Sequence, residues 1–106
     1  MQKADFLKLM RYPDEWLSSD MYPDELFAGQ LAMYKPGDEK GSEHDRNGAF
    51  HWWLRRNPSK IQLLGLLRLA ALDPDALMAR DVLSYIEKSS EFDEELAVEA
   101  RALFPG

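Results

Sequence analysis

The sequence of 106 residues contains no cysteine and only two histidines. The lack of cysteine excludes a disulfide scaffold, a thiolate zinc site, an iron–sulfur cluster and a cysteine nucleophile. His44 and His51 are seven residues apart, so on one helix they would share a face but lie about 10 Å apart along its axis. Two helical histidines that bind one metal are usually three or four residues apart. The sequence therefore predicts no metal site and no cofactor.

Long apolar runs and targeting signals are also lacking. The most apolar stretch, residues 61–72, contains Arg68. As a helix it would be about 18 Å long, which is short of the roughly 30 Å hydrocarbon layer. The first residues carry charges too close together for a secretory signal. We expect a cytoplasmic protein that has no membrane partner.

Recognisable catalytic motifs are missing as well. Residues 37–42 superficially resemble a phosphate loop, but the lysine precedes the second glycine, and two carboxylates there would repel phosphate. There is no Gly-x-Ser-x-Gly nucleophile elbow. The formal net charge of -6 argues against general affinity for nucleic acid. The sequence thus predicts no catalytic residue and favours a non-enzymatic role.

Proline, glycine and capping residues interrupt the sequence at regular intervals, and apolar residues recur at helical spacing between these breaks. No segment shows sustained strand alternation. This pattern predicts an all-α fold, a compact bundle of six to seven short helices that forms a single domain over residues 1–106. A charged loop is expected over about residues 35–48. Because Gly48 weakens a helix, residues 43–48 stay open between loop and helix. The predicted helices span about residues 4–11, 12–17, 23–34, 43–56, 61–72, 76–88 and 91–104.

Several helix starts have recognisable signatures. The motif Tyr-Pro-Asp-Glu occurs at residues 12–15 and again at 22–25. A proline in the first helical position followed by two acids suits a helix start, so one favoured local structure used twice is the simpler interpretation, and a duplicated recognition loop is the alternative. Ser59 and Gln62 are spaced as a capping box. Residues 73–75 are expected to end one helix and cap the next, and residues 90–93 to cap the last.

The helix over residues 61–72 is apolar nearly all round, which predicts that it forms the centre of the core. Only Gln62, Gly65 and Arg68 make a thin polar stripe. The two helices that follow add apolar stripes at helical spacing. The predicted core comprises Ile61, Leu63, Leu64, Leu66, Leu67, Leu69, Leu72, Met78, Val82, Tyr85, Ile86, Phe92, Leu96, Ala100 and Leu103.

The segment 66–78, with Leu72-Asp73-Pro74-Asp75 at its centre, resembles the turn between the two helices of a HEAT repeat. The arginine that this family places shortly after its turn stands one position late here, at Arg80. A solenoid needs several stacked repeats, and the sequence holds no second copy. The resemblance implies a helical hairpin and no function.

Charge is unevenly distributed along the chain. Residues 1–45 carry ten acids and five bases, residues 46–72 carry five bases and no acid, and residues 73–106 carry nine acids and three bases. One interpretation, which we favour, is that the central bases pair with acids of the flanking helices. The other is a basic recognition face on an otherwise acidic protein.

The fourth predicted helix makes this choice concrete. If Phe50, Trp53 and Leu54 face inward, a tryptophan and two arginines are left outward or sideways, and these residue types are enriched at interface hot spots. The structural alternative is that Trp52 wedges against residues 35–42 or the N-terminal helices, with Arg56 stacked on its ring. The candidate partner-binding residues are His51, Trp52, Arg55, Arg56, His44 and Asn47.

Two functions of different classes follow. The first is a small acidic protein–protein interaction module, such as an immunity or inhibitor-type protein or an adaptor, whose partner is another protein or a second copy of this chain. The second is a small helical enzyme or ligand-binding regulator with a cleft beside residues 35–48. Its site would use His44, Asp45, His51 and Arg55. A DNA-reading helix-turn-helix is disfavoured because its recognition helix would be too apolar.

Overall fold

All the regular secondary structure in the described residues is helical. The computed structural model describes residues 1–18, 20–35 and 41–104, apart from the side chains of residues 41–44. This part of the chain contains no strand, which confirms the prediction of an all-α single-domain fold. The elements are α1 (Lys3–Leu9), the 3-10 helix η1 (Asp14–Leu17), α2 (Asp24–Met33), α3 (Gly41–Leu54), α4 (Lys60–Ala71), α5 (Leu77–Lys88) and α6 (Glu94–Leu103).

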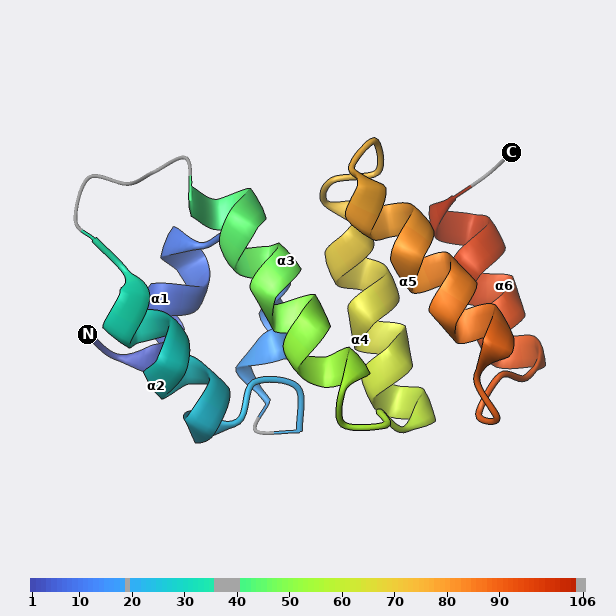
Figure 1. The fold of residues 1–106 in the computed structure, drawn as a ribbon, viewed down its shortest axis with the longest axis horizontal. Coiled ribbons are helices and arrows are strands. Elements are labelled where there is room, and N and C mark those ends of the chain that lie inside the picture. Colours follow the sequence, from blue (N-terminus) through green and yellow to red (C-terminus); the bar gives the residue numbers. More distant parts are fainter. Residues whose placement is uncertain (19, 36–40, 105–106) are drawn as a thin grey trace.

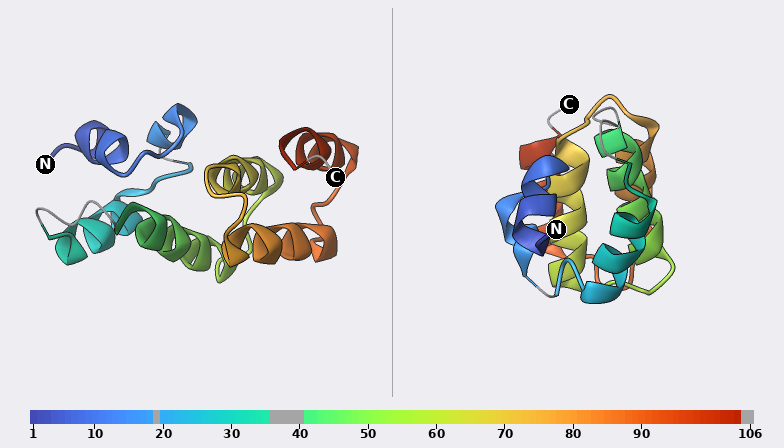
Figure 2. Two further views of the ribbon diagram at one scale, coloured as in Figure 1. Left: turned by 90° about the horizontal axis from the view of Figure 1, so that it is seen from above. Right: turned by 90° about the vertical axis from the view of Figure 1, so that its left-hand side faces the viewer.

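The helices lie in two layers (Figure 2), with α1 and α2 at one end of the molecule and α6 at the other (Figure 1). Seen from above in Figure 2, one layer holds α1, η1, α4 and α6, and the other holds α2, α3 and α5. From α3 onward the chain alternates between the layers, so α4 packs against both α5 and α6 while α3 packs against α5. The α4–α5 pair is the helical hairpin that the resemblance implied. None of the described helices is long and apolar enough to span a bilayer.

The central position of α4 agrees with the prediction, but its buried face is narrower than predicted. Leu63, Leu66, Leu67 and Leu69 are fully buried and Leu64 is half-buried. Gly65, which was expected in the polar stripe, is buried because a side chain from the η1–α2 connection covers it. The prediction was wrong for Ile61, in the first turn of the helix, and for Leu72, directly after its end. Ile61 is 67% exposed and Leu72 is 43% exposed.

Gly65 lies where the chain before α2 crosses α4. The indole Nε1 of Trp16 donates to the Gly65 carbonyl oxygen over 3.1 Å. A Cβ added at Gly65 would stand 2.1 Å from Cε of Met21. A larger residue at position 65 would therefore displace the end of the Met21 side chain from the surface of α4.

Helices α5 and α6 complete the core with the predicted stripes. Met78, Val82 and Ile86 of α5 and Leu96 of α6 are buried, and Tyr85, Ala100 and Leu103 pack partly buried against them. Phe92 was predicted in this core and is instead 40% exposed. The reason is local, because α6 begins two residues later, at Glu94, with Asp93 as its N-cap and the Asp93 carboxylate accepting from the Leu96 N–H.

The helix starts agree only partly with their expected signatures. The capping box predicted at Ser59 and Gln62 is present, and in it the Ser59 N–H donates to the side-chain oxygen of Gln62 over 2.9 Å. Pro13 and Pro23 were predicted as the first residues of their helices. They are instead the N-cap residues of η1 and α2, one position earlier. Helix α5 begins after Ala76 without a side-chain cap, so the predicted cap by residues 73–75 was wrong.

Helix α3 begins earlier than the fourth predicted helix. It starts at Gly41 and ends at Leu54, so residues 41–48 are helical and the prediction of a loop was wrong for them, while residues 36–40 of that predicted loop lie outside the described residues. The expected capping box at residues 42–45 involves side chains that lie outside the described residues. Gly48 lies inside this helix although glycine is a poor helix former. The contacts of Arg46, two residues earlier, hold the helix against the rest of the fold.

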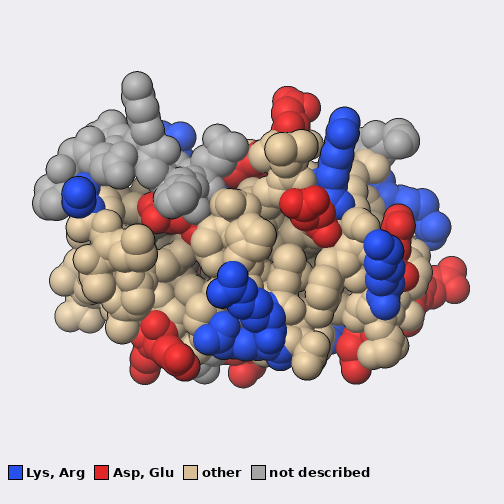
Figure 3. Space-filling model, in the orientation of Figure 1, with Lys and Arg blue, Asp and Glu red and all other residues tan. Residues whose placement is uncertain are grey.

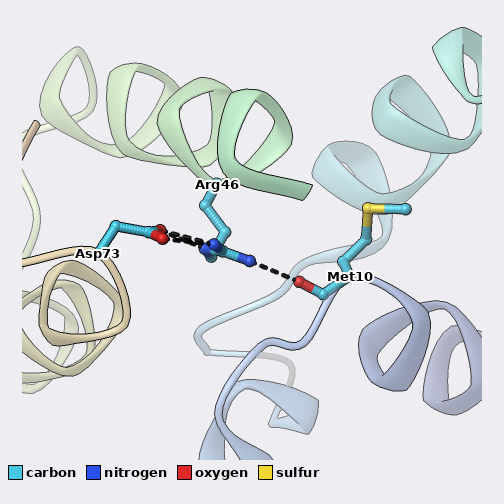
Figure 4. A network of polar contacts seen from close by, with 3 residues as sticks. All are labelled: Met10, Arg46 and Asp73. Atoms are coloured by element: carbon cyan, nitrogen blue, oxygen red, sulfur yellow. Dashed lines mark hydrogen bonds and ion pairs between the residues drawn. The ribbon is translucent and has the colours of Figure 1, made fainter. Parts of the chain in front are cut away.

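Arg46 joins three parts of the chain through one buried guanidinium (Figure 4). Its Nε and Nη2 donate to the two carboxylate oxygens of Asp73 over 2.7 and 2.8 Å. Its Nη1 donates to the Met10 carbonyl oxygen at the end of α1 over 2.9 Å. The Arg46 side chain is 6% exposed and that of Asp73 is 19% exposed. Asp73 serves this pair instead of capping α5, so the α4–α5 turn is fastened to α3.

Two further bases of the central stretch pair with acids of the flanks, as the favoured interpretation of the charge pattern predicts. Lys60 contacts Asp93 and Glu95 at 2.7 and 2.6 Å. This pairing raises the pKa of Lys60 and lowers that of Asp93, in both cases mainly through the hydrogen bond between them. Arg68 lies between Glu15 and Glu99, 3.3 Å from each.

Replacing a leucine on the buried side of α4 tests this arrangement. We expect Leu67→Ala to lower the free energy of unfolding by about 2–5 kcal/mol, because it leaves a cavity among fully buried side chains. Ile61→Ala in the same helix is the matched control and should change it by no more than about 0.5 kcal/mol, since the side chain is largely exposed. Urea unfolding followed by circular dichroism measures both values, and equal losses would contradict the packing of α4.

Removing the buried guanidinium tests the junction at Arg46. We expect Arg46→Ala to destabilise the protein by about 3–5 kcal/mol, because it leaves the Asp73 carboxylate without its partner in a largely buried position. Arg80→Ala removes an exposed arginine of α5 and should stay within about 0.5 kcal/mol of the wild type. Similar melting temperatures for the two variants would show that the Arg46–Asp73 pair does not hold the helices together.

Candidate partner-binding face and groove

The last two turns of α3 divide their side chains between the core and the surface. Phe50 and Trp53 are buried and Leu54 is half-buried, as predicted. The indole Nε1 of Trp53 donates to the Met21 carbonyl oxygen over 3.0 Å, which fixes the end of α3 against the segment before α2. The opposite side of α3 therefore faces the surface.

On that side, His51, Arg55 and Arg56 are exposed and Trp52 is half-buried. The Trp52 ring meets the Trp53 ring edge to face, with centroids 5.0 Å apart. The Arg56 guanidinium lies over the Trp52 ring, 3.8 Å from its centroid, and its Nη1 donates to the Trp52 carbonyl oxygen over 2.8 Å. The stacking that the structural alternative predicted is thus formed, and it leaves a guanidinium at the surface. We call Trp52, Arg55 and Arg56 the basic face.

The basic face differs from the rest of the acid-free stretch in how its charges are neutralised. Arg46, Lys60 and Arg68 each contact a carboxylate. Within the described part of the chain, neither Arg55 nor Arg56 has a carboxylate within 4.0 Å. Figure 3 shows a cluster of basic side chains over the C-terminal end of α3. Two cations therefore stand free of internal pairing among the described residues.

A groove of about 530 Å³ lies between α2 and α3 and reaches Trp52. Its walls are mainly apolar, and the exposed end of α2 contributes Met33, which is 79% exposed. A Cβ added at Gly29 would meet nothing within 4 Å, and one at Gly48 would meet only Nε2 of Gln30 at 4.0 Å. The described lining residues are Glu25, Leu26, Gly29, Gln30, Met33, Tyr34, Lys35, Asp45, Gly48 and Trp52.

Gln30 joins the groove to the buried aromatic residues beneath it. Its Oε1 accepts hydrogen bonds from the hydroxyl groups of Tyr12, over 3.0 Å, and of Tyr22. Its Nε2 donates to the Asp45 carbonyl oxygen over 2.8 Å, across to α3. The two tyrosines are those of the repeated Tyr-Pro-Asp-Glu motif, and both are buried. Both tyrosines of the repeat therefore donate to the same glutamine. This contact within the fold favours a structural role for the repeat over a duplicated recognition loop.

The four residues of the predicted enzyme or ligand site are not brought together among the described side chains. Asp45 lines the groove, whereas His51 and Arg55 are not among its lining residues. The His44 side chain lies outside the described residues, and Asn47 is half-buried on α3. Within the described residues, no three His, Asp or Glu side chains are grouped as metal ligands would be.

The groove and its glutamine were missed from the sequence. Gly48 drew attention only as a weakness in a helix, and Gln30 stands in α2 without any motif around it. Two glycines inside predicted helices, Gly29 and Gly48, could have indicated the groove. Glycine is among the poorest helix formers, so its occurrence inside a helix needs a structural or functional explanation.

Because two tyrosines are buried, the free energy of unfolding should depend on pH in the alkaline range. Burial raises the pKa of both Tyr12 and Tyr22 above the ordinary value near 10. Above that pH the unfolded chain loses phenolic protons that the folded chain keeps, so the free energy of unfolding should fall by up to about 1.4 kcal/mol per pH unit for each tyrosine. Urea unfolding between pH 8 and pH 11.5 measures this decline.

The control for this prediction is the double variant Tyr12→Phe/Tyr22→Phe. It should be less stable at pH 7, because Gln30 loses both donors, and its stability should decline less steeply above pH 10. Lys60, whose pKa is also raised, contributes to the decline in both proteins, so the difference in slope isolates the tyrosines. Equal slopes would contradict the prediction.

Comparison with known proteins finds no relative of this chain. The chain matches no protein-family model, no curated protein and no solved structure.

Proposed function

We propose that this chain is a non-enzymatic protein–protein interaction module that binds its partner through the basic face together with His51, His44 and Asn47. One observation carries the proposal. Three of the five bases in the acid-free stretch are paired with carboxylates, and the two that have no carboxylate partner among the described residues, Arg55 and Arg56, stand beside a half-buried tryptophan. Trp and Arg are the residue types that contribute most at interface hot spots.

The charge of the whole chain suggests what kind of partner would fit. A net charge of -6 attracts a basic protein over long distances and speeds its association. The two arginines then favour a local acidic site on that partner, because carboxylates pair well with guanidinium groups. Inhibitors, immunity proteins that neutralise a basic toxin, and adaptors in the cytoplasm are functions of this class.

The groove supports a second candidate, a ligand-binding regulator. Its volume lies within the roughly 300–1,000 Å³ that is usual for small-molecule sites. Of the residues predicted for such a site, however, only Asp45 lines it among the described side chains. The interaction module therefore stays the better supported proposal.

Paired arginine variants test the proposed function. Wild-type protein is used to capture partners from a lysate of the native cells, and each captured protein is identified, purified and titrated against this chain by calorimetry. We expect Arg55→Ala/Arg56→Ala to weaken binding by about thirtyfold or more, since hot-spot truncations cost about 2 kcal/mol or more. Analytical ultracentrifugation of the same variants applies the test to self-association.

The matched control is Arg80→Ala/Arg101→Ala, which removes the same charge from exposed positions on α5 and α6. It should bind as the wild type does. If both double variants bind every purified partner with unchanged affinity, and neither changes the oligomeric state, the basic face is not an interface and the proposal is wrong.

A further inference from the structure

The groove and the basic face form one continuous surface. Trp52 belongs to both, because its ring lines the groove and carries the Arg56 guanidinium. On a helix, side chains three and four residues apart are neighbours, so Arg55 and Arg56 follow Trp52 by one turn. Although α3 ends at Leu54, the Arg55 N–H still donates to the His51 carbonyl oxygen over 3.3 Å, which places Arg55 directly after the last helical turn. An apolar groove thus ends at two cations.

The α2–α3 groove has room that nothing in the described part of the chain fills. Gly29 and Gly48 face it from opposite helices, and an added Cβ would touch no core atom at either position. Neither glycine is therefore needed for packing within the described chain. Glycines on facing helices do allow a third backbone to come close. Met33, at the rim, is a flexible apolar side chain of the kind that adapts to a bound partner.

We propose that the groove receives a helical segment of the partner protein, whose leucine or phenylalanine side chains enter between α2 and α3 and whose aspartate or glutamate side chains pair with Arg55 and Arg56. This inference rests on the proposed function and names the partner's chemistry. Amphipathic helices bind to apolar grooves between helices in this manner.

Charged side chains of both signs surround the groove. Arg55 and Arg56 follow Trp52, while Glu25, Lys35 and Asp45 are among the lining residues. Carboxylates of the partner are favoured beside the two arginines. We therefore expect the acidic residues of the segment at the end of its apolar stripe that lies against Trp52.

Selection from a random peptide library tests the inference without a known partner. A phage-displayed library of 16-residue peptides is selected on the wild-type protein, and enriched peptides are synthesised with a fluorescent label. We expect leucine or phenylalanine at helical spacing with aspartate or glutamate at one end. Enrichment of basic peptides, or no enrichment at all, would overturn the inference and leave the proposed function to its own test.

Variants that fill the groove locate the binding site. Gly29→Leu and Gly48→Leu replace a poor helix former by a good one, so both proteins should melt no lower than the wild type. By fluorescence anisotropy they should bind the selected peptide at least tenfold more weakly. Ala28→Leu adds the same side chain to an exposed position of α2 outside the groove and should bind as the wild type does.

The arginine variants separate this inference from the function on which it rests. Arg55→Ala/Arg56→Ala should also weaken peptide binding at least tenfold, and Arg80→Ala/Arg101→Ala should not. If the groove-filling variants bind a purified partner normally while Arg55→Ala/Arg56→Ala does not, the groove inference is wrong and the proposed function stands. If only the groove-filling variants lose binding, the acidic character of the segment is wrong.

Discussion

The burial of one guanidinium constrains the whole fold. Removing a charge from water is costly unless the charge is paired and its hydrogen bonds are made. Arg46 meets that requirement only where the end of α1, the middle of α3 and the α4–α5 turn come together, through Met10 and Asp73. An arrangement that moves any of the three leaves a buried charge or carbonyl without its partner, so the contact selects one packing of the two layers.

The same contact determines which side of α3 meets solvent. With about 3.6 residues per turn, Phe50 and Trp53 lie on the side of the helix that carries Arg46, and all three are buried. Asp45, Gly48 and Trp52 then form a separate stripe, which lines the groove. A buried ion pair near the middle of the helix thus places the candidate site along its length, and Trp53 fixes the C-terminal end through Met21.

Patterns within one segment could be predicted from the sequence, and contacts between distant segments could not. Periodicity identified the helices, the buried leucines of α4 and the inward residues of α3, because each depends on neighbours three or four positions away. It was wrong for Ile61 and Phe92, which continue an apolar pattern past the point where another helix covers it. Charge counting indicated that the central bases pair internally but could not identify Asp73 as the partner of Arg46. The groove depends on how α2 lies against α3, and no local pattern records that.

Trp52 combines the two interpretations that the sequence left open. It packs on Trp53 as a structural residue would, and it carries Arg56 at the surface as an interface residue would. The stacking and the hydrogen bond to the Trp52 carbonyl oxygen already hold the Arg56 side chain in one conformation. Ordering a flexible side chain on binding costs about 0.5–1.5 kcal/mol, and for Arg56 much of that loss has occurred in the free protein. The structural role of Trp52 therefore orders the charge that the proposed partner would meet.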